Sequence, residues 1–146
     1  MRTPHSWFGG LLLLATALTG CTMPGRVAVA EIGGTWAEPV ELVLPNDDTT
    51  GCYDWQLFVR CDDRSTTERF TLQITVLSPD SLRFSESVAV QLPPEAAPAP
   101  LLREVAVDYR RRVRLSAQGN YRVRIAPQQP VEGIAAVGIQ TLKIDE

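Results

Sequence analysis

Histidine is almost absent from this sequence. The single histidine of the 146-residue chain is His5, close to its start. Ser-His-Asp and Cys-His nucleophile arrangements, and histidine-based metal sites, would need a histidine elsewhere. The chain also lacks a CxxC pair and a glycine-rich phosphate loop. These absences exclude the common nucleophilic, zinc and nucleotide-binding chemistries, and we predict no catalytic residues, no metal site and no cofactor.

Long hydrophobic runs are also absent. The apolar stretch at residues 7–18 has twelve residues, whereas a membrane-spanning helix needs about 20. Arg2 before it and small residues after it are typical of a signal peptide. Residues 18–21 are LTGC, the form of a bacterial lipobox, in which Cys21 receives diacylglycerol and becomes the first mature residue. The alternative is an ordinary secretory signal with a chance cysteine, but position, length and all four residues favour the lipoprotein.

The residues after Cys21 indicate which membrane holds the protein. Acyl chains on Cys21 would hold the mature protein stably on a lipid surface. Position 22 is Thr rather than the Asp that retains many Gram-negative lipoproteins at the inner membrane. No acidic cluster of the kind that directs lipoproteins to the cell surface follows. We therefore expect the periplasmic face of the outer membrane.

Acidic residues outnumber basic ones. The chain has 14 Lys and Arg against 17 Asp and Glu, and loss of residues 1–20 removes only Arg2, which leaves a net charge of −4. This charge argues against nucleic-acid binding, which needs a basic surface. The mature length suits one domain with one core. We expect a signal peptide at 1–20, a lipidated tether at 21–34 and one domain at 35–146.

Acidic doublets are the remaining candidates for chemistry. Asp47–Asp48, Asp62–Asp63 and Asp54 could in principle supply a glycosidase-like carboxylate pair or bind calcium. Both doublets lie in polar, turn-like stretches without the spacing of a calcium-binding loop. We therefore favour solvated turn residues over a hydrolase.

Alternating apolar and polar residues dominate the mature chain. This period of two predicts strands at 40–44, 53–60, 69–77, 82–92, 103–116, 121–126 and 136–144. Segments 69–77 and 82–92 predict a hairpin, with Glu86 as the one charged residue on an otherwise apolar face. No helix longer than a turn is expected. The fold prediction is all-β: a two-sheet antiparallel β-sandwich, jelly-roll-like, with seven to eight strands.

Two cysteines flank one of these strands. A continuous strand between Cys52 and Cys61 would separate their Cα atoms by about 30 Å. A disulfide needs them within about 7 Å. We therefore predict that both cysteines are unbridged.

Five arginines alternate along two consecutive predicted strands. If these strands form a hairpin around residues 116–120, all five share one face. Like charges directly opposite each other destabilise a sheet, so Glu104, Asp108 or acidic residues of a neighbouring strand should neutralise them. The functional interpretation is a patch for an anionic partner, a lipid headgroup, a glycan carboxylate or an acidic protein. The alternative is a solvated sheet face without a binding role. The five are Arg110, Arg112, Arg114, Arg122 and Arg124.

Several short motifs resemble a known family. The chain is similar to the GldH family of gliding-motility lipoproteins, most strongly in its last 30 residues. The similarity lies in the lipobox, Trp36, LFVR at 57–60, GNYRVRI at 119–125 and VEGIAAVGIQ at 131–140. The chain departs from the family pattern after Arg60 and in the middle, at residues 93–107. Gly119 and Gly133 in these motifs suit turns, where positive φ is easy for glycine.

The resemblance implies a non-enzymatic envelope lipoprotein associated with gliding machinery in motile species. We expect an interaction or assembly component whose partners are the membrane, through Cys21, and other envelope proteins, without nucleic acid or a small-molecule ligand. The alternative is a lipid-anchored glycan- or anion-binding β-sandwich module. Exposed tryptophans would favour that alternative, but Trp55 lies on the apolar face of its strand and is expected in the core.

Overall fold

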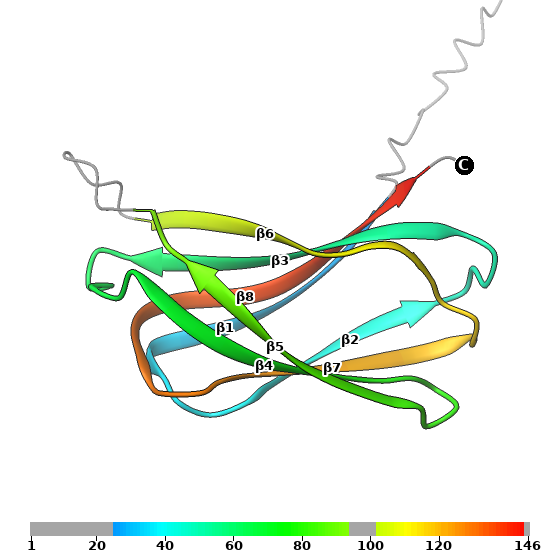
Figure 1. Cartoon of the computed structure of the whole chain (residues 1–146), viewed down its shortest axis with the longest axis horizontal. Coiled ribbons are helices and arrows are strands. Elements are labelled where there is room, and N and C mark those ends of the chain that lie inside the picture. Colours follow the sequence, from blue (N-terminus) through cyan, green and yellow to red (C-terminus); the bar gives the residue numbers. More distant parts are fainter. Residues whose placement is uncertain (1–24, 94–101, 145–146) are drawn as a thin grey trace, which may run out of the picture.

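Eight β-strands make up the part of the chain that the structure describes. The computed structural model describes residues 25–93 and 102–144, and it contains no helix in these residues (Figure 1). The strands are β1 (Gly25–Trp36), β2 (Val40–Asn46), β3 (Cys52–Asp62), β4 (Arg69–Leu77), β5 (Arg83–Gln91), β6 (Leu102–Arg114), β7 (Gly119–Pro127) and β8 (Val131–Ile144).

The strands form two antiparallel sheets of four. One sheet has the order β1-β8-β3-β6 and the other β2-β7-β4-β5 (Figure 1). Every connection except the β4–β5 hairpin carries the chain from one sheet to the other. This interleaving is that of a jelly roll. The predicted all-β, jelly-roll-like sandwich is therefore confirmed.

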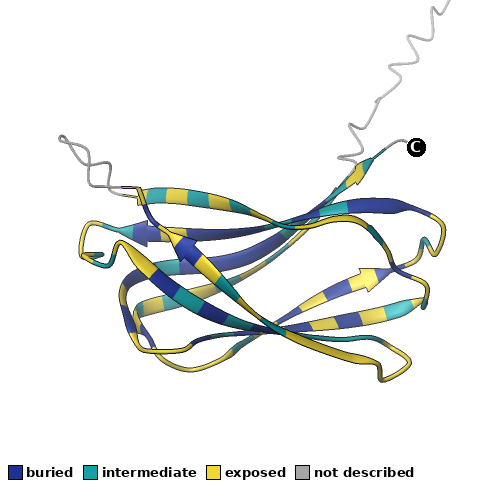
Figure 2. Cartoon of the chain, viewed as in Figure 1, coloured by how far each residue is buried: buried dark blue, intermediate teal, exposed yellow. Residues whose placement is uncertain are grey.

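Alternation of apolar and polar residues places the core between the two sheets. Along the strands, buried and exposed residues follow one another as the side chains point alternately inward and outward (Figure 2). Leu57 and Val59 of one sheet and Leu72 and Ile74 of the other are fully buried. The expected core position of Trp55 is confirmed, with 3% of the residue exposed.

The predicted hairpin of 69–77 with 82–92 is also confirmed. β4 and β5 pair in unbroken register from Arg69 opposite Gln91 to Leu77 opposite Arg83. The turn is closed by a backbone hydrogen bond of 3.0 Å from the Ser81 N–H to the Ser78 carbonyl.

The tether expected at 21–34 is wrong for residues 25–34. These residues belong to β1, which pairs antiparallel with β8 from Gly25 opposite Leu142 to Trp36 opposite Val131. The inward residues of β1 include the small Ala28 and Ala30, and the exposed residues include Val27 and Val29, so the period of two gave a weak signal. Residues 21–24 and the predicted signal peptide at 1–20 lie outside the described residues.

Two motif glycines have the backbone conformation expected of them. Gly119 and Gly133 have φ values of 127° and 74°, which lie in the region that side chains rarely adopt. A Cβ at Gly133 would also lie 2.3 Å from the Ser65 backbone nitrogen. Gly133 is therefore required both by its φ and by the close approach of residues 64–65.

Cys52 and Cys61 are free, as predicted, and both are buried. β3 runs without a break from Cys52 to Asp62, so the strand itself keeps the two thiols apart. Burial raises the pKa of the Cys61 thiol, which makes it a weak nucleophile.

Candidate functional site at the open edge of the sandwich

The five arginines singled out in the sequence do not share a face. β6 pairs with β3 in one sheet, whereas β7 lies between β2 and β4 in the other. Arg122 and Arg124 point outward from β7, because Val123 and Ile125 between and beyond them are buried. The predicted hairpin around residues 116–120, and with it the single patch, is wrong.

Two side chains hold the connection between β6 and β7 in its crossing path. Asn46, at the end of β2, donates from Nδ2 to the carbonyls of Leu115 at 3.0 Å and Ala117 at 2.9 Å. The Tyr121 hydroxyl accepts a hydrogen bond of 3.1 Å from the Ala117 N–H. The two Asn46 hydrogen bonds span 69 and 71 residues, so the local sequence does not reveal them.

The even alternation of arginines also fails within β6. The register of β3 with β6 shifts twice between Tyr53 and Gln56. Arg112 has a φ of 55° and its backbone N–H donates to Asp54 Oδ1 at 2.8 Å. Bulges of this kind re-aim side chains. As a result Arg110 lies opposite Trp55 and points to the space between the sheets.

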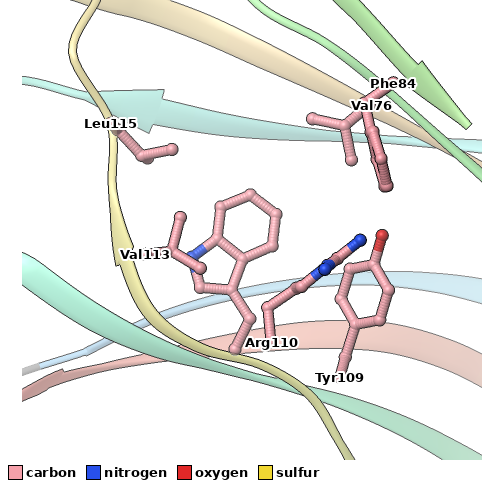
Figure 3. Close-up of a pocket in the computed structure, with 7 residues that line it drawn as sticks. Val76, Phe84, Tyr109, Arg110, Val113 and Leu115 are labelled. Atoms are coloured by element: carbon pink, nitrogen blue, oxygen red, sulfur yellow. The ribbon is translucent and has the colours of Figure 1, made fainter.

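Re-aimed Arg110 borders an apolar cavity of about 270 Å³. Figure 3 shows Tyr109 and Arg110 pointing side by side toward Val76 and Phe84, with Val113 and Leu115 at the other side of the space. The cavity lies between β6 and β5, each the last strand of its sheet. We call this side of the molecule the open edge. The lining residues are Trp55, Val76, Phe84, Tyr109, Arg110, Val113 and Leu115.

Arg110 bridges the two sheets across the open edge. Its Nη2 lies 2.6 Å from Glu86 Oε1 on β5. Its guanidinium carbon also lies 4.7 Å from the centre of the Phe84 ring, within the range of a cation–π contact. Glu86, the charged residue that interrupted the apolar face of β5 in the sequence, is thus the partner of Arg110. Arg110 is neutralised by a residue of the opposite sheet, and not by Glu104, Asp108 or a neighbouring strand as expected.

Two buried donors at the cavity lack hydrogen-bond partners of normal geometry among the described residues. They are the Trp55 indole Nε1 and the Tyr109 hydroxyl. Burial, and then the neighbouring Glu86 carboxylate, raises the pKa of the Tyr109 hydroxyl. An unsatisfied buried donor costs about 1–3 kcal/mol. The open edge is therefore less well satisfied than the rest of the core.

The other predicted acceptors of positive charge are distributed over the surface. Glu104 pairs with Arg60 at 2.8 Å, and Asp108 pairs with Arg111 at 2.5 Å. Arg122 lies 3.9 Å from Glu41 of the neighbouring strand β2. None of these three pairs is placed at the cavity.

The acidic doublets organise turns. Asp48 accepts hydrogen bonds from the Thr50 N–H at 3.0 Å and the Gly51 N–H at 2.8 Å, and it pairs with Lys143 at 2.9 Å. Lys143, and then the Gly51 N–H, lowers the pKa of Asp48 below its usual range. Asp62 binds Arg64 of the same turn, which lowers the Asp62 pKa. Asp48 lies in the loop after β2, as expected, whereas Asp62 is the last residue of β3 and holds the turn that follows it.

Within residues 25–93 and 102–144, no group of three or more His, Cys, Asp or Glu residues is arranged to hold a metal ion. The same part of the chain holds no helix that is long and apolar enough to cross a membrane. Trp36 and Trp55, the two tryptophans considered for a sugar site, are both buried. Neither ring therefore offers a face on which a sugar could stack.

Comparison of the chain with protein-family models and with curated proteins finds no match. The case for a function therefore depends on the chain's own residues.

One feature of the sequence could have pointed to the irregularity in β6 that forms this site. Arg110, Arg111 and Arg112 form a run of three charged residues inside a strand whose other residues alternate. Arg111 falls on the face that carries Tyr109 and Val113, and a bulge is one way for a strand to accommodate such a break in the alternation. Phe84 and Val76 were placed on apolar faces, but no local pattern shows that β5 and β6 border the same space.

Proposed function

We propose that this protein is a non-enzymatic, lipid-anchored interaction component of the cell envelope, similar to the GldH lipoproteins. It is held on the periplasmic face of the outer membrane through Cys21 and contacts other envelope proteins through its open edge. The lipobox at residues 18–21 supports the anchor. The motifs of the last 30 residues support the family resemblance.

The observation that carries the proposal is the apolar cavity at the open edge. Phe84 at its rim is 49% exposed, and β5 and β6 are the terminal strands of their sheets. Exposed aromatic surface beside terminal strands is typical of protein-binding surfaces. The donors of Trp55 and Tyr109 offer hydrogen bonds to a partner that opens this edge.

The alternative of a glycan- or anion-binding module has less support. The five arginines lie in different sheets, and Arg110 and Arg122 each face a carboxylate of their own. With both tryptophans buried, neither an anionic patch nor a stacking platform is assembled among the described residues.

The test is a pull-down from detergent-solubilised membranes with the native lipidated chain. Phe84→Glu is the test variant, and Val43→Glu is the matched control. Val43 is 47% exposed and lies on β2, the terminal strand at the opposite edge of the same sheet from β5. We expect the unmodified chain and the control to capture envelope proteins. The captured amount should fall at least tenfold with Phe84→Glu. Equal capture by both variants would remove the open edge as the contact site. Retention of glycans or lipids without protein would favour the alternative module.

A further inference from the structure

The chain between the lipid anchor and the first strand is very short. Cys21 precedes Gly25, the first residue of β1, by four residues. A fully extended chain spans at most about 3.6 Å per residue, so Gly25 can lie no further than roughly 14 Å from Cys21. If Cys21 carries lipid, as the proposed function requires, the end of the sandwich that holds Gly25 must lie at the bilayer surface.

The tip of the β4–β5 hairpin lies at this same end. Arg26 donates to the Pro45 carbonyl, which brings the start of β1 beside the end of β2. The start of β7 pairs with the end of β2, and Gly119 at that start packs against Pro79 of the hairpin turn. In Figure 1 the β4–β5 turn, the β2–β3 and β6–β7 connections and the end of β8 all lie at the right.

The hairpin tip presents an unusual apolar side chain. Leu82 is 68% exposed, the highest value among the exposed large hydrophobic residues described. The backbone beside it is satisfied within the turn: the Leu82 N–H donates to Ser78 Oγ at 3.0 Å, and the Leu82 carbonyl accepts from the Ser78 N–H at 2.9 Å. These paired backbone groups of Ser78 and Leu82 would stay satisfied if Leu82 entered the lipid interface.

The charges at this end are balanced. Asp47 pairs with Arg26, and Asp48 pairs with Lys143, so both carboxylates of the neighbouring loop are matched by cations. Asp80, two residues before Leu82, accepts a hydrogen bond from Ser78 Oγ, and Arg83 follows Leu82. An apolar residue beside a long basic side chain is a common arrangement at a membrane surface, where the cation reaches the phosphates.

We propose that the Gly25 end of the sandwich rests on the bilayer, with Leu82 inserted at the boundary between headgroups and acyl chains. This orientation depends on the proposed lipidation of Cys21. It places the opposite end, with Glu38, Asp63 and Glu132, away from the membrane. Phe84 lies two residues beyond Leu82, so the orientation also brings the open edge close to the bilayer, where a membrane-embedded partner could reach it.

Site-directed spin labelling tests the orientation directly. The lipidated full-length chain carries a label at Leu82→Cys or, as the matched control, at Leu102→Cys. Leu102 is 58% exposed and lies at the other end, opposite Asp62. Cys52 and Cys61 are buried and stay in place. The proteins are reconstituted into phosphatidylethanolamine–phosphatidylglycerol vesicles, and power saturation measures access of an aqueous nickel chelate and of oxygen to each label.

We expect the label at position 82 to be at least fivefold less accessible to the nickel chelate than the label at 102, and more accessible to oxygen. Equal access of the chelate to both labels would overturn the orientation. Protection at 82 that disappears when the protein is diluted in lipid would also overturn it, because a second copy rather than the bilayer would then cover Leu82.

Failure of the proposed lipidation gives a different result. Mass spectrometry of the N-terminal peptide and flotation of the vesicles show whether Cys21 carries acyl chains. A chain without them would overturn both the proposed anchor and the orientation. An acylated chain with an accessible label at 82 would overturn the orientation alone.

Discussion

The two sides of the sandwich differ in how completely they are closed. At the side formed by β1 and β2, which we call the closed edge, Trp36 is 2% exposed and its Nε1 donates to the Glu38 carbonyl at 2.8 Å. Arg26 of β1 reaches the Pro45 carbonyl and Asp47 near the end of β2. Apolar packing and hydrogen bonds therefore both join the sheets there.

The open edge is joined by much less. Arg110 and Glu86 form the ion pair that crosses it, and both side chains are partly exposed. Beneath them lies the cavity of about 270 Å³, where the Trp55 indole and the Tyr109 hydroxyl lack hydrogen-bond partners of normal geometry. An exposed ion pair contributes about 0–1 kcal/mol. The closed edge therefore stabilises the sandwich, whereas the open edge is left available for contact.

The largest expected effect tests the closed edge. Trp36→Ala removes a buried aromatic ring and its hydrogen bond to Glu38. We expect the free energy of unfolding to fall by about 3–5 kcal/mol, measured by urea denaturation followed by circular dichroism. Phe84→Ala, at the open edge, should cost less than about 1 kcal/mol, because half of that residue is already exposed. Equal losses would mean that the two edges do not differ.

A second effect concerns the connection that separates β6 from β7. Asn46→Ala leaves the carbonyls of Leu115 and Ala117 without their donor. We expect a loss of about 1–3 kcal/mol in the free energy of unfolding, with faster amide exchange in residues 115–118. Val43→Ala in the same strand is the control, since Val43 is exposed, and it should change stability little.

A smaller effect tests the bridge across the open edge. Arg110→Ala removes the ion pair with Glu86 and the contact with the Phe84 ring. The expected loss is about 1 kcal/mol, smaller at high salt because the pair is screened. Arg111→Ala is the matched control, because Arg111 pairs with Asp108 on the surface. If both variants are equally stable at low salt, Arg110 does not hold this edge together.

The smallest effect at neutral pH concerns Asp48, beside the closed edge. Its folded-state pKa lies below its ordinary value of 3.8, chiefly because of Lys143. A lowered pKa means that Asp48 stabilises the fold above its unfolded-state pKa and that this stability disappears as the pH falls below about 4. Thermal unfolding followed between pH 7 and 2 should therefore show a shallower acid loss for Asp48→Asn than for the unmodified chain. Asp80→Asn serves as the control.

Apart from β1, the strands could be predicted from the sequence, whereas of their pairings only the β4–β5 hairpin could. The period of two identified β3 through Tyr53, Trp55, Leu57 and Val59, and it placed Trp55 in the core. The same period treated β6 and β7 as a hairpin, because a short polar connection has no local mark that separates a turn from a crossing between sheets. Asn46, which decides the path, lies 69 residues from Leu115.

The candidate site needed the same long-range information. Glu86 looked anomalous in its own strand, whereas Arg110 fitted the expected alternation, and only the fold shows that the two are partners. A similar contact joins two of the short motifs noted in the sequence. Phe58 of LFVR lies against Gly138 of VEGIAAVGIQ, where a Cβ would lie 2.3 Å from the Phe58 ring. These motifs are thus explained as packing, and their positions do not reveal the open edge.

Photo-crosslinking in living cells tests the central claim most directly. A photoreactive phenylalanine analogue is placed at Phe84 of the open edge or at Val43 of β2, which have similar exposures of 49% and 47%. Our account predicts discrete crosslinks to one or a few envelope proteins from position 84 and none from position 43. Crosslinks from position 43 alone, or none from position 84 in a lipidated and membrane-bound chain, would contradict it.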